Sequence, residues 1–259
     1  MGLFNSDSFQ LWELPLLFGT GVVAGFVDSI AGGGGLITLP VMLSLGGDPQ
    51  HALGTNKLQA SFGSASATWH YSQAGAVKVQ DCWRAGVFTF LGAALGTLGV
   101  RQIGPDTLKV VIPLLLIAVA VYSLRTPKLG EVDAKPQIAR GRFDLVFGLL
   151  LGFYDGFFGP GTGTFWTMAF VLMLGFNLTR ATAHTKVVNF ASNLCSLLIF
   201  GLAGKINYPA GIIMGSGQLI GARFGSQMVM QRGTRLIRPV FITVVLAITG
   251  KLLYDTYFK

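Results

Sequence analysis

Apolar residues along this chain gather in long segments that short polar stretches separate. The segments cover residues 14–31, 36–46, 58–73, 85–104, 108–124, 145–158, 164–176, 187–204, 209–230 and 239–254. A helix needs about 20 apolar residues to cross a bilayer, so 36–46 and 164–176 are too short to cross alone. Each of these two short segments follows a cluster of glycines. The pattern predicts an all-α polytopic membrane protein with two glycine-broken helices.

The composition excludes a soluble protein. Charged residues make up 12% of the 259 residues, about half the usual share of a soluble domain, and the mean hydropathy is +0.60. The net charge of +8 comes from basic residues in short loops rather than from a basic stripe, so we expect a lipid bilayer and no nucleic acid as partner. Cys82 and Cys195 lack metal-ligand spacing, so we expect no metal and no cofactor.

The two halves of the chain repeat each other. One constant shift places Lys57 on Lys186 and the glycine cluster Gly32–Gly35 on the segment Gly161–Thr164. Internal repeats of this kind are typical of secondary transporters. Each repeat is expected to hold a glycine-broken re-entrant or half-helix that is followed by three membrane helices. We therefore expect a first transmembrane repeat over 1–124, a cytoplasmic linker over 125–143 and a second transmembrane repeat over 144–259.

The loop charges favour two repeats of inverted orientation. If each half crosses the membrane an odd number of times and the N-terminus lies outside, eleven basic loop residues lie inside and four outside. A parallel arrangement divides the same residues more evenly. The inside group is Lys78, Arg84, Arg125, Lys128, Lys135, Arg140, Arg142, Arg180, Arg232, Arg235 and Arg238. The outside group is Arg101, Lys109, Lys205 and Lys259.

The glycine clusters predict an anion site inside the membrane. Half-helices that begin near Gly35 and Thr164 would point their free N–H groups and positive dipole ends at the membrane interior. Such a break is tolerated only where protein or a water-filled cavity covers it. The alternative is that the glycines only permit close helix packing. The candidate ligand-binding residues of the clusters are Gly33, Gly34, Gly35, Gly161, Thr162 and Gly163.

Two lysines head polar stripes in the repeats. Lys57 and Lys186 each stand at the predicted start of an apolar helix, where a cation opposes the helix dipole and needs an anionic partner. Polar residues follow at helical spacing: Ser61, Ser64 and Thr68 in the first half, and Asn189, Asn193 and Ser196 in the second. Alternatively, the lysines extend to the lipid headgroups and the hydroxyls bond their own helices. The candidate ligand-binding residues here are Thr55, Asn56, Lys57, His184, Thr185, Lys186, Asn189 and Asn193.

Asp28 and Asp155 are equivalent carboxylates at membrane depth. A buried carboxylate needs a basic partner or a proton. We favour a structural ion pair with Lys57, Lys186 or Arg223 over a proton-coupling role, because an aspartate also suits the cap of the half-helix that follows. Arg223 has no basic counterpart in the first half, so it is a candidate either for the substrate path or for holding a helix end.

Several motifs of the chain resemble the TauE/SafE family of membrane proteins, and within it the YfcA-like branch. The motifs are Gly25-Phe-Val-Asp-Ser-Ile-Ala-Gly-Gly-Gly-Gly-Leu36, Thr55-Asn-Lys57, Gly152-Phe-Tyr-Asp-Gly-Phe-Phe-Gly-Pro-Gly-Thr-Gly163, and Thr182-Ala-His-Thr-Lys186 with Asn189 and Ser192-Asn193. The resemblance implies a bacterial inner-membrane permease for sulfur-containing anions. Pro160 and His184 depart from the first half, so a strictly symmetric site is not expected.

Together these features predict a secondary transporter for a small anion that works by alternating access. The expected substrate is sulfite, thiosulfate or an organosulfonate, and a homodimer is the only protein partner that we retain. Three alternatives stay open: an anion channel, a membrane scaffold without transport, and an intramembrane enzyme that uses Ser64 and His184. The enzyme is disfavoured because no GxSG or HExxH motif is present.

Overall fold

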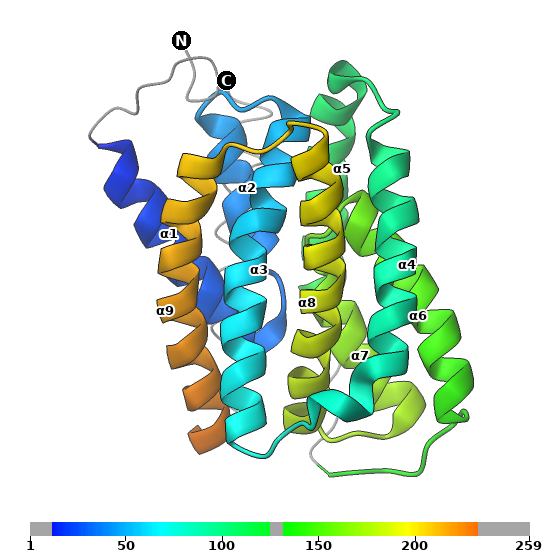
Figure 1. Ribbon diagram of the computed structural model, residues 1–259. Coiled ribbons are helices and arrows are strands. Elements are labelled where there is room, and N and C mark those ends of the chain that lie inside the picture. The colour runs from blue at the N-terminus through cyan, green and yellow to red at the C-terminus, as the bar shows by residue number, and fades with distance from the viewer. Residues whose placement is uncertain (1–11, 125–131, 233–259) are drawn as a thin grey trace.

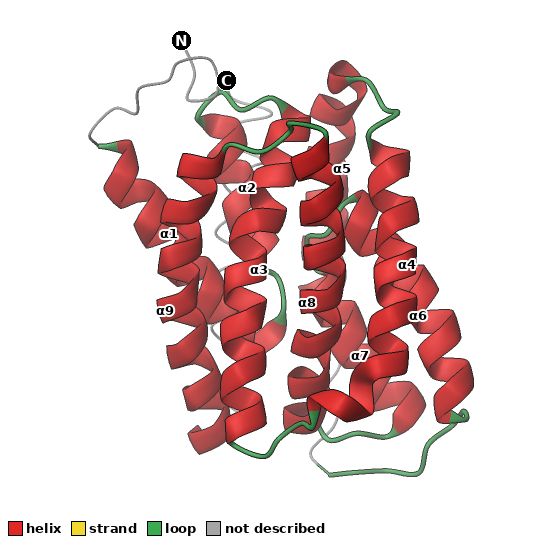
Figure 2. Ribbon diagram, in the orientation of Figure 1, coloured by secondary structure: helices red, strands yellow, loops and turns green. Residues whose placement is uncertain are grey.

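The computed structural model describes residues 12–124 and 132–232, and these residues form helices and connecting loops without a strand (Figures 1 and 2). The first half comprises α1 (Glu13–Ala31), α2 (Gly34–Ser44), α3 (Pro49–Gln73), the 3-10 helix η1 (Val79–Cys82), α4 (Trp83–Val100) and α5 (Pro105–Leu124). The second half comprises α6 (Arg140–Phe157), α7 (Thr162–Leu174), α8 (Leu178–Leu202) and α9 (Tyr208–Arg232). The prediction of an all-α protein is confirmed for the described part of the chain.

Helix length separates the membrane-crossing helices from the two half-helices. Within the described residues, three stretches are long and apolar enough to span a bilayer: Glu13–Ala31, Val79–Val100 and Leu178–Leu202. The helices α2 and α7 have only 11 and 13 residues. At a rise of about 1.5 Å per residue they reach about 16 to 20 Å, well short of the hydrocarbon thickness of about 30 Å. Three α-helices, α3, α4 and α5, follow α2 in the first half, and among them only the stretch Val79–Val100 that contains α4 is one of these candidate spans. The third segment expected after α7, 239–254, lies outside the described residues.

The helices α3 and α8 begin earlier than their hydrophobic pattern predicts, near 49 and 178 rather than 58 and 187. Asp48 and Asn177 cap them, and each side chain accepts a hydrogen bond from the backbone N–H three residues later, at 3.2 and 2.9 Å. The first turns of both helices are polar, so a prediction based on runs of apolar residues places the helix starts too late. Lys57 and Lys186 therefore lie well inside long helices, and the prediction that they stand at helix starts was wrong.

Close glycine contacts hold the helices in pairs. Figure 1 shows α3 and α8 side by side in the middle of the molecule, between α9 and α4, while α1 packs on α9 and α6 packs on α4. A Cβ atom on Gly25 of α1 would lie 2.7 Å from the Cα atom of Gln218, and one on Gly156 of α6 would lie 2.7 Å from that of Ala93. Small residues at such crossings let membrane helices approach closely.

The helices α3 and α8 begin at opposite ends of the molecule (Figure 1). The start of α3 lies beside the start of α9, where Thr55 Oγ1 accepts a hydrogen bond from the backbone N–H of Asn207 at 2.9 Å. The start of α8 lies at the other end, where Arg180 contacts Asp133 at 3.2 Å. At the α8 end are Lys78, Arg84, Lys135, Arg140, Arg142, Arg180 and Arg232, and at the α3 end are Arg101, Lys109 and Lys205. Arg125, Lys128, Arg235, Arg238 and Lys259 lie outside the described residues.

Candidate functional site

The two glycine clusters break the chain in the middle of the molecule. Between α1 and α2, Gly32 and Gly33 have φ angles of 71° and 148°, and between α6 and α7, Gly159 and Gly161 have φ angles of 98° and 81°. Residues with a side chain rarely adopt these angles, so the breaks require glycine. The half-helices begin at positions 34 and 162, within two residues of the predicted starts.

The two breaks lie against each other. The hydroxyl of Thr164 donates to the backbone oxygens of Gly32 at 2.9 Å and of Ala31 at 3.1 Å. A Cβ atom on Gly163 would lie 2.6 Å from the Cα atom of Gly32. The glycines therefore serve close packing as well as the chain breaks, and the irregular backbone is covered by protein, as a break inside a membrane requires.

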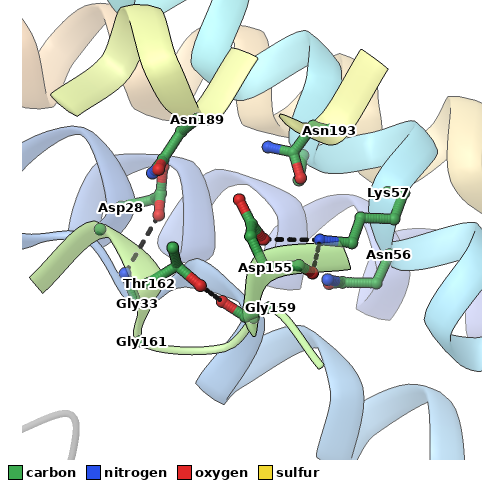
Figure 3. A pocket seen from close by; sticks show the side chains of 13 residues that line it. Asp28, Gly33, Asn56, Lys57, Asp155, Gly159, Gly161, Thr162, Asn189 and Asn193 are labelled. Carbon is green, nitrogen blue, oxygen red and sulfur yellow. Dashed lines mark hydrogen bonds and ion pairs between the residues drawn. The ribbon is translucent and has the colours of Figure 1, made fainter. Parts of the chain in front are cut away.

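Each lysine pairs with the aspartate of the other half. The Lys57 ammonium donates to Asp155 Oδ1 at 2.6 Å and to the Asp155 backbone oxygen at 2.5 Å (Figure 3). The Lys186 ammonium donates to Asp28 Oδ2 at 3.0 Å and also to the Asp28 backbone oxygen. The structure thus has the ion pairing favoured from the sequence. The formal charges of these four residues cancel.

The two ion pairs differ in their surroundings. The Asp155 side chain is 5% exposed, and its second oxygen accepts a hydrogen bond from the Ser192 hydroxyl. The Asp28 side chain is 21% exposed, and its Oδ1 accepts hydrogen bonds from the backbone N–H groups of Gly33 at 3.0 Å and Gly34 at 3.2 Å. Asp28 therefore caps the half-helix α2, whereas Asp155 does not cap α7.

A pocket lies where the two breaks meet α3 and α8 (Figure 3). Its empty volume is about 360 Å³, including the open side. The lining residues are Asp28, Gly33, Gly35, Asn56, Lys57, Ala60, Asp155, Gly159, Gly161, Thr162, Gly163, Asn189 and Asn193. Most of the residues predicted from the sequence are thus brought together in one place, although they come from both halves.

Six predicted residues do not line this pocket: Gly34, Thr55, His184, Thr185, Lys186 and Arg223. Lys186 is fully buried in its pair with Asp28, and Thr185 forms a hydrogen bond with Thr167 at 3.1 Å. His184 bonds the Arg180 backbone oxygen at 2.8 Å and packs edge-on against Phe176, as a structural histidine does.

Arg223, the sixth of these residues, is exposed on α9. It is therefore not the partner of either buried aspartate. Ala60 and Gly159 line the pocket although neither was predicted. Ala60 has no polar side chain, so composition did not indicate it as a pocket residue. Its alignment with Asn189 in the second repeat was a signal that could have predicted its place.

Asn56 is held by a buried network. Its side-chain oxygen accepts hydrogen bonds from Thr38 Oγ1 and from Gln59 Nε2, both at 2.6 Å. Gln59 in turn accepts a hydrogen bond from Gln218 of α9. Because two donors hold the oxygen, the amide nitrogen of Asn56 is left to face the pocket, as Figure 3 shows. Nothing in the sequence pattern indicated this network.

Asn189 and Asn193 face the pocket from one side of α8 (Figure 3). They are only 6% and 7% exposed, yet within residues 12–124 and 132–232 neither side chain forms a hydrogen bond, and Asn189 Oδ1 is fully buried. Buried polar groups nearly always have a partner, so two such carboxamides indicate a ligand or bound water.

Their counterparts on α3 are Ala60 and Ser64, and the Ser64 hydroxyl donates to the Ala60 backbone oxygen at 2.7 Å. Ser61 likewise bonds its own helix, through the Lys57 backbone oxygen at 2.7 Å. Ser61 and Ser64 therefore bond their own helix, as the alternative interpretation expects, whereas Thr68 Oγ1 is buried without a partner among the described residues. Two whole carboxamides without a partner among the described residues come from α8, whereas α3 offers only the amide nitrogen of Asn56, so the pocket is chemically asymmetric.

The chain is similar to known membrane proteins over nearly its whole length. The family model "Sulfite exporter TauE/SafE" matches residues 17–252. A probable membrane transporter protein of Haemophilus influenzae is 47% identical over 93% of this chain and 95% of its own length. The probable membrane transporter protein YfcA of Escherichia coli K12 is 45% identical over 94% and 91%.

A more distant relative, the probable membrane transporter protein YunE of Bacillus subtilis, is 22% identical over 92% of this chain and 97% of its own length. No solved structure matches the chain. The helical architecture, the apolar spans and these relatives agree with one another. The chain belongs to the TauE/SafE family and is an integral membrane transporter.

Proposed function

We propose that the protein is a secondary transporter for a small sulfur-containing anion, either sulfite, thiosulfate or an organosulfonate. The observation that carries this proposal is the pair of buried carboxamides, Asn189 and Asn193, which lack a partner among the described residues and face the pocket. The substrate class follows the description of the matching family model.

The chemistry of the pocket suits an oxyanion. The half-helix α7 begins at the pocket, and no acidic residue occupies its first turn, so its positive dipole end faces the cavity. The amide nitrogens of Asn56, Asn189 and Asn193 are hydrogen-bond donors for sulfonate or sulfite oxygens. Donors from α3, α7 and α8 would thus surround one ligand.

Alternating access around this pocket would come from two inverted repeats. This arrangement is supported by the opposite directions of α3 and α8 and by the matching pairs α1 with α9 and α6 with α4. An orientation with the N-terminus outside is supported by the basic residues at the α8 end, since positive loops stay inside. The pocket lies between the repeats, where rocking of one half against the other would expose it to each side in turn.

The test is exchange of radiolabelled thiosulfate, sulfite and benzenesulfonate in liposomes that contain the purified protein. Asn189→Ala and Asn193→Ala are expected to raise the half-saturation concentration about 10- to 100-fold each, because a hydrogen bond to a charged group contributes about 1.5–3 kcal/mol. Ser61→Ala is the matched control, since its hydroxyl bonds its own helix, and it is expected to exchange like the wild type.

The outcomes separate the proposal from its alternatives. Absence of exchange for sulfite, thiosulfate and benzenesulfonate by folded wild-type protein would contradict the proposed function and favour a scaffold. Unitary currents in planar bilayers, at rates beyond carrier turnover, would identify a channel instead. Unchanged half-saturation in both asparagine variants would remove the pocket from the transport path.

A further inference from the structure

Within residues 12–124 and 132–232, the charged groups beside the pocket sum to zero and leave no net positive charge to neutralise an anion. The four ionised groups beside it are Asp28, Lys57, Asp155 and Lys186, and they already pair as two salt bridges. Burying a further charge without a counter-charge is strongly unfavourable in a low-dielectric interior. If the protein carries an anion, as proposed above, a positive charge has to enter with it.

Asp28 is placed to accept that charge. Its carboxylate lines the pocket, is 21% exposed, and occupies the N-terminal amides of α2, the position at which a bound oxyanion would be stabilised. The carboxylate thus holds, inside the protein, the place that an anionic ligand would take. Asp155 differs, because it is 5% exposed and both of its oxygens are held by side chains, those of Lys57 and Ser192.

We propose that Asp28 binds one proton for each anion that the protein carries, so that transport is proton-coupled. A proton from the water on the entry side converts the carboxylate to the neutral acid. The N–H group of Gly33, which lines the pocket, then becomes available to the anion, and the charge of Lys186 beside the pocket is no longer neutralised by Asp28. On the exit side the anion leaves, the proton returns to water, and the carboxylate takes back its three donors.

The surroundings of Asp28 contain few other groups that could take up the proton. From α8 it faces Lys186, and from α3 come Lys57 and Tyr71, whose hydroxyl donates to the Ser29 backbone oxygen at 2.8 Å. From α6 comes Asp155 across the pocket, and α9 carries Arg223, which is exposed. The helices α2 and α7 contain no charged residue.

A ratio of one proton per anion predicts whether uptake of each anion responds to the membrane potential. One proton balances one negative charge, so uptake of a monovalent sulfonate such as benzenesulfonate is electroneutral and does not respond to a potassium–valinomycin potential. Uptake of thiosulfate, a dianion, moves one net negative charge and responds to the potential. In both cases a pH dye inside the liposomes reports one proton entering with each anion. Uptake without proton entry would overturn the coupling.

Variants separate the coupling from transport itself. Asp28→Asn cannot bind the proton, so its accumulation of benzenesulfonate driven by an acidic exterior is expected to fall at least tenfold, and the pH dye is expected to report no proton entering with the anion. Asp106→Asn is the matched control, because this carboxylate is exposed and its one ion pair among the described residues is with Lys109 at the molecular surface. It is expected to accumulate benzenesulfonate like the wild type.

The same assays distinguish the failure of each proposal. Wild-type protein that exchanges anions without moving protons would overturn the coupling and leave the transporter intact. Wild-type protein without any exchange would overturn the transporter itself. Proton-driven accumulation by Asp28→Asn at the wild-type level would remove Asp28 from the coupling. If Asp28→Asn does not fold, the proton count of the wild type still decides between coupled and uncoupled transport.

Discussion

Replacement of Asp155 by alanine is expected to lower the free energy of unfolding by about 3–5 kcal/mol, because it leaves the Lys57 ammonium buried without a partner. The Lys57 side chain is 1% exposed, and its ammonium group donates to the carboxylate and to the backbone oxygen of Asp155. The change would be measured by denaturant or thermal unfolding in detergent, together with the folded yield by size-exclusion chromatography.

A double variant tests the cause of this loss. Lys57→Met combined with Asp155→Leu removes both charges and keeps similar volumes, so it is expected to recover most of the lost stability. Asp106→Ala removes one partner of an exposed pair and is expected to leave the unfolding midpoint unchanged. Equal losses in Asp155→Ala and in the double variant would show that packing, and not an unpaired charge, causes the effect.

The buried pairs also change how lysine variants are interpreted. The sequence predicts that Lys57 and Lys186 bind the anion directly, but in the structure each lysine is engaged by an aspartate. Lys57→Ala would leave the Asp155 carboxylate without its counter-charge, so a loss of transport would not by itself indicate lost ligand binding. Variants of Asn189 and Asn193 report on the pocket more directly, since truncating either side chain breaks no hydrogen bond among the described residues.

Gly163→Ala and Gly32→Ala are each expected to abolish exchange and to reduce the folded yield severely. A methyl group on Gly163 would lie 2.6 Å from the Cα atom of Gly32, and one on Gly32 would overlap the backbone of Gly163. Gly32 also has a φ angle of 71°, a backbone conformation that L-residues rarely adopt and that costs about 1–3 kcal/mol. Because the clash is with backbone, no side-chain rotation relieves it.

Gly19→Ala on α1 is the control for the glycine variants. A Cβ atom there has nothing within 4 Å, so the variant is expected to fold and exchange like the wild type. Alanine is also the better helix former by about 0.5–1 kcal/mol. Wild-type exchange and yield in Gly163→Ala would mean that the two breaks need not touch for the protein to function.

Features that both repeats share were predictable from the sequence. The short half-helices and the glycine breaks follow from two glycine clusters, each ahead of a short apolar segment. A carboxylate and a lysine at matching positions of both halves indicated buried charge near the breaks. Comparison of the two halves strengthens the prediction of such features, because each feature occurs twice in one chain.

Contacts between the halves could not be predicted in this way. Repeat alignment says that Lys57 corresponds to Lys186, but not that each lysine reaches the aspartate of the opposite half. The network that orients Asn56 includes Gln218 of α9. Gln218 lies far from Asn56 in the sequence, so no local pattern predicts this contact. The capped polar turns before Lys57 and Lys186 were missed because hydrophobic periodicity does not register a polar start of a helix.

The exchange of charge partners between the halves has a consequence for biosynthesis. The first half leaves the ribosome with Asp28 and Lys57, whose final partners are on α8 and α6 of the second half. Until these helices are made, neither charge can reach its native ion pair inside the bilayer. The first half alone is therefore an incomplete folding unit, because the counter-charges of Asp28 and Lys57 lie on helices that are translated later.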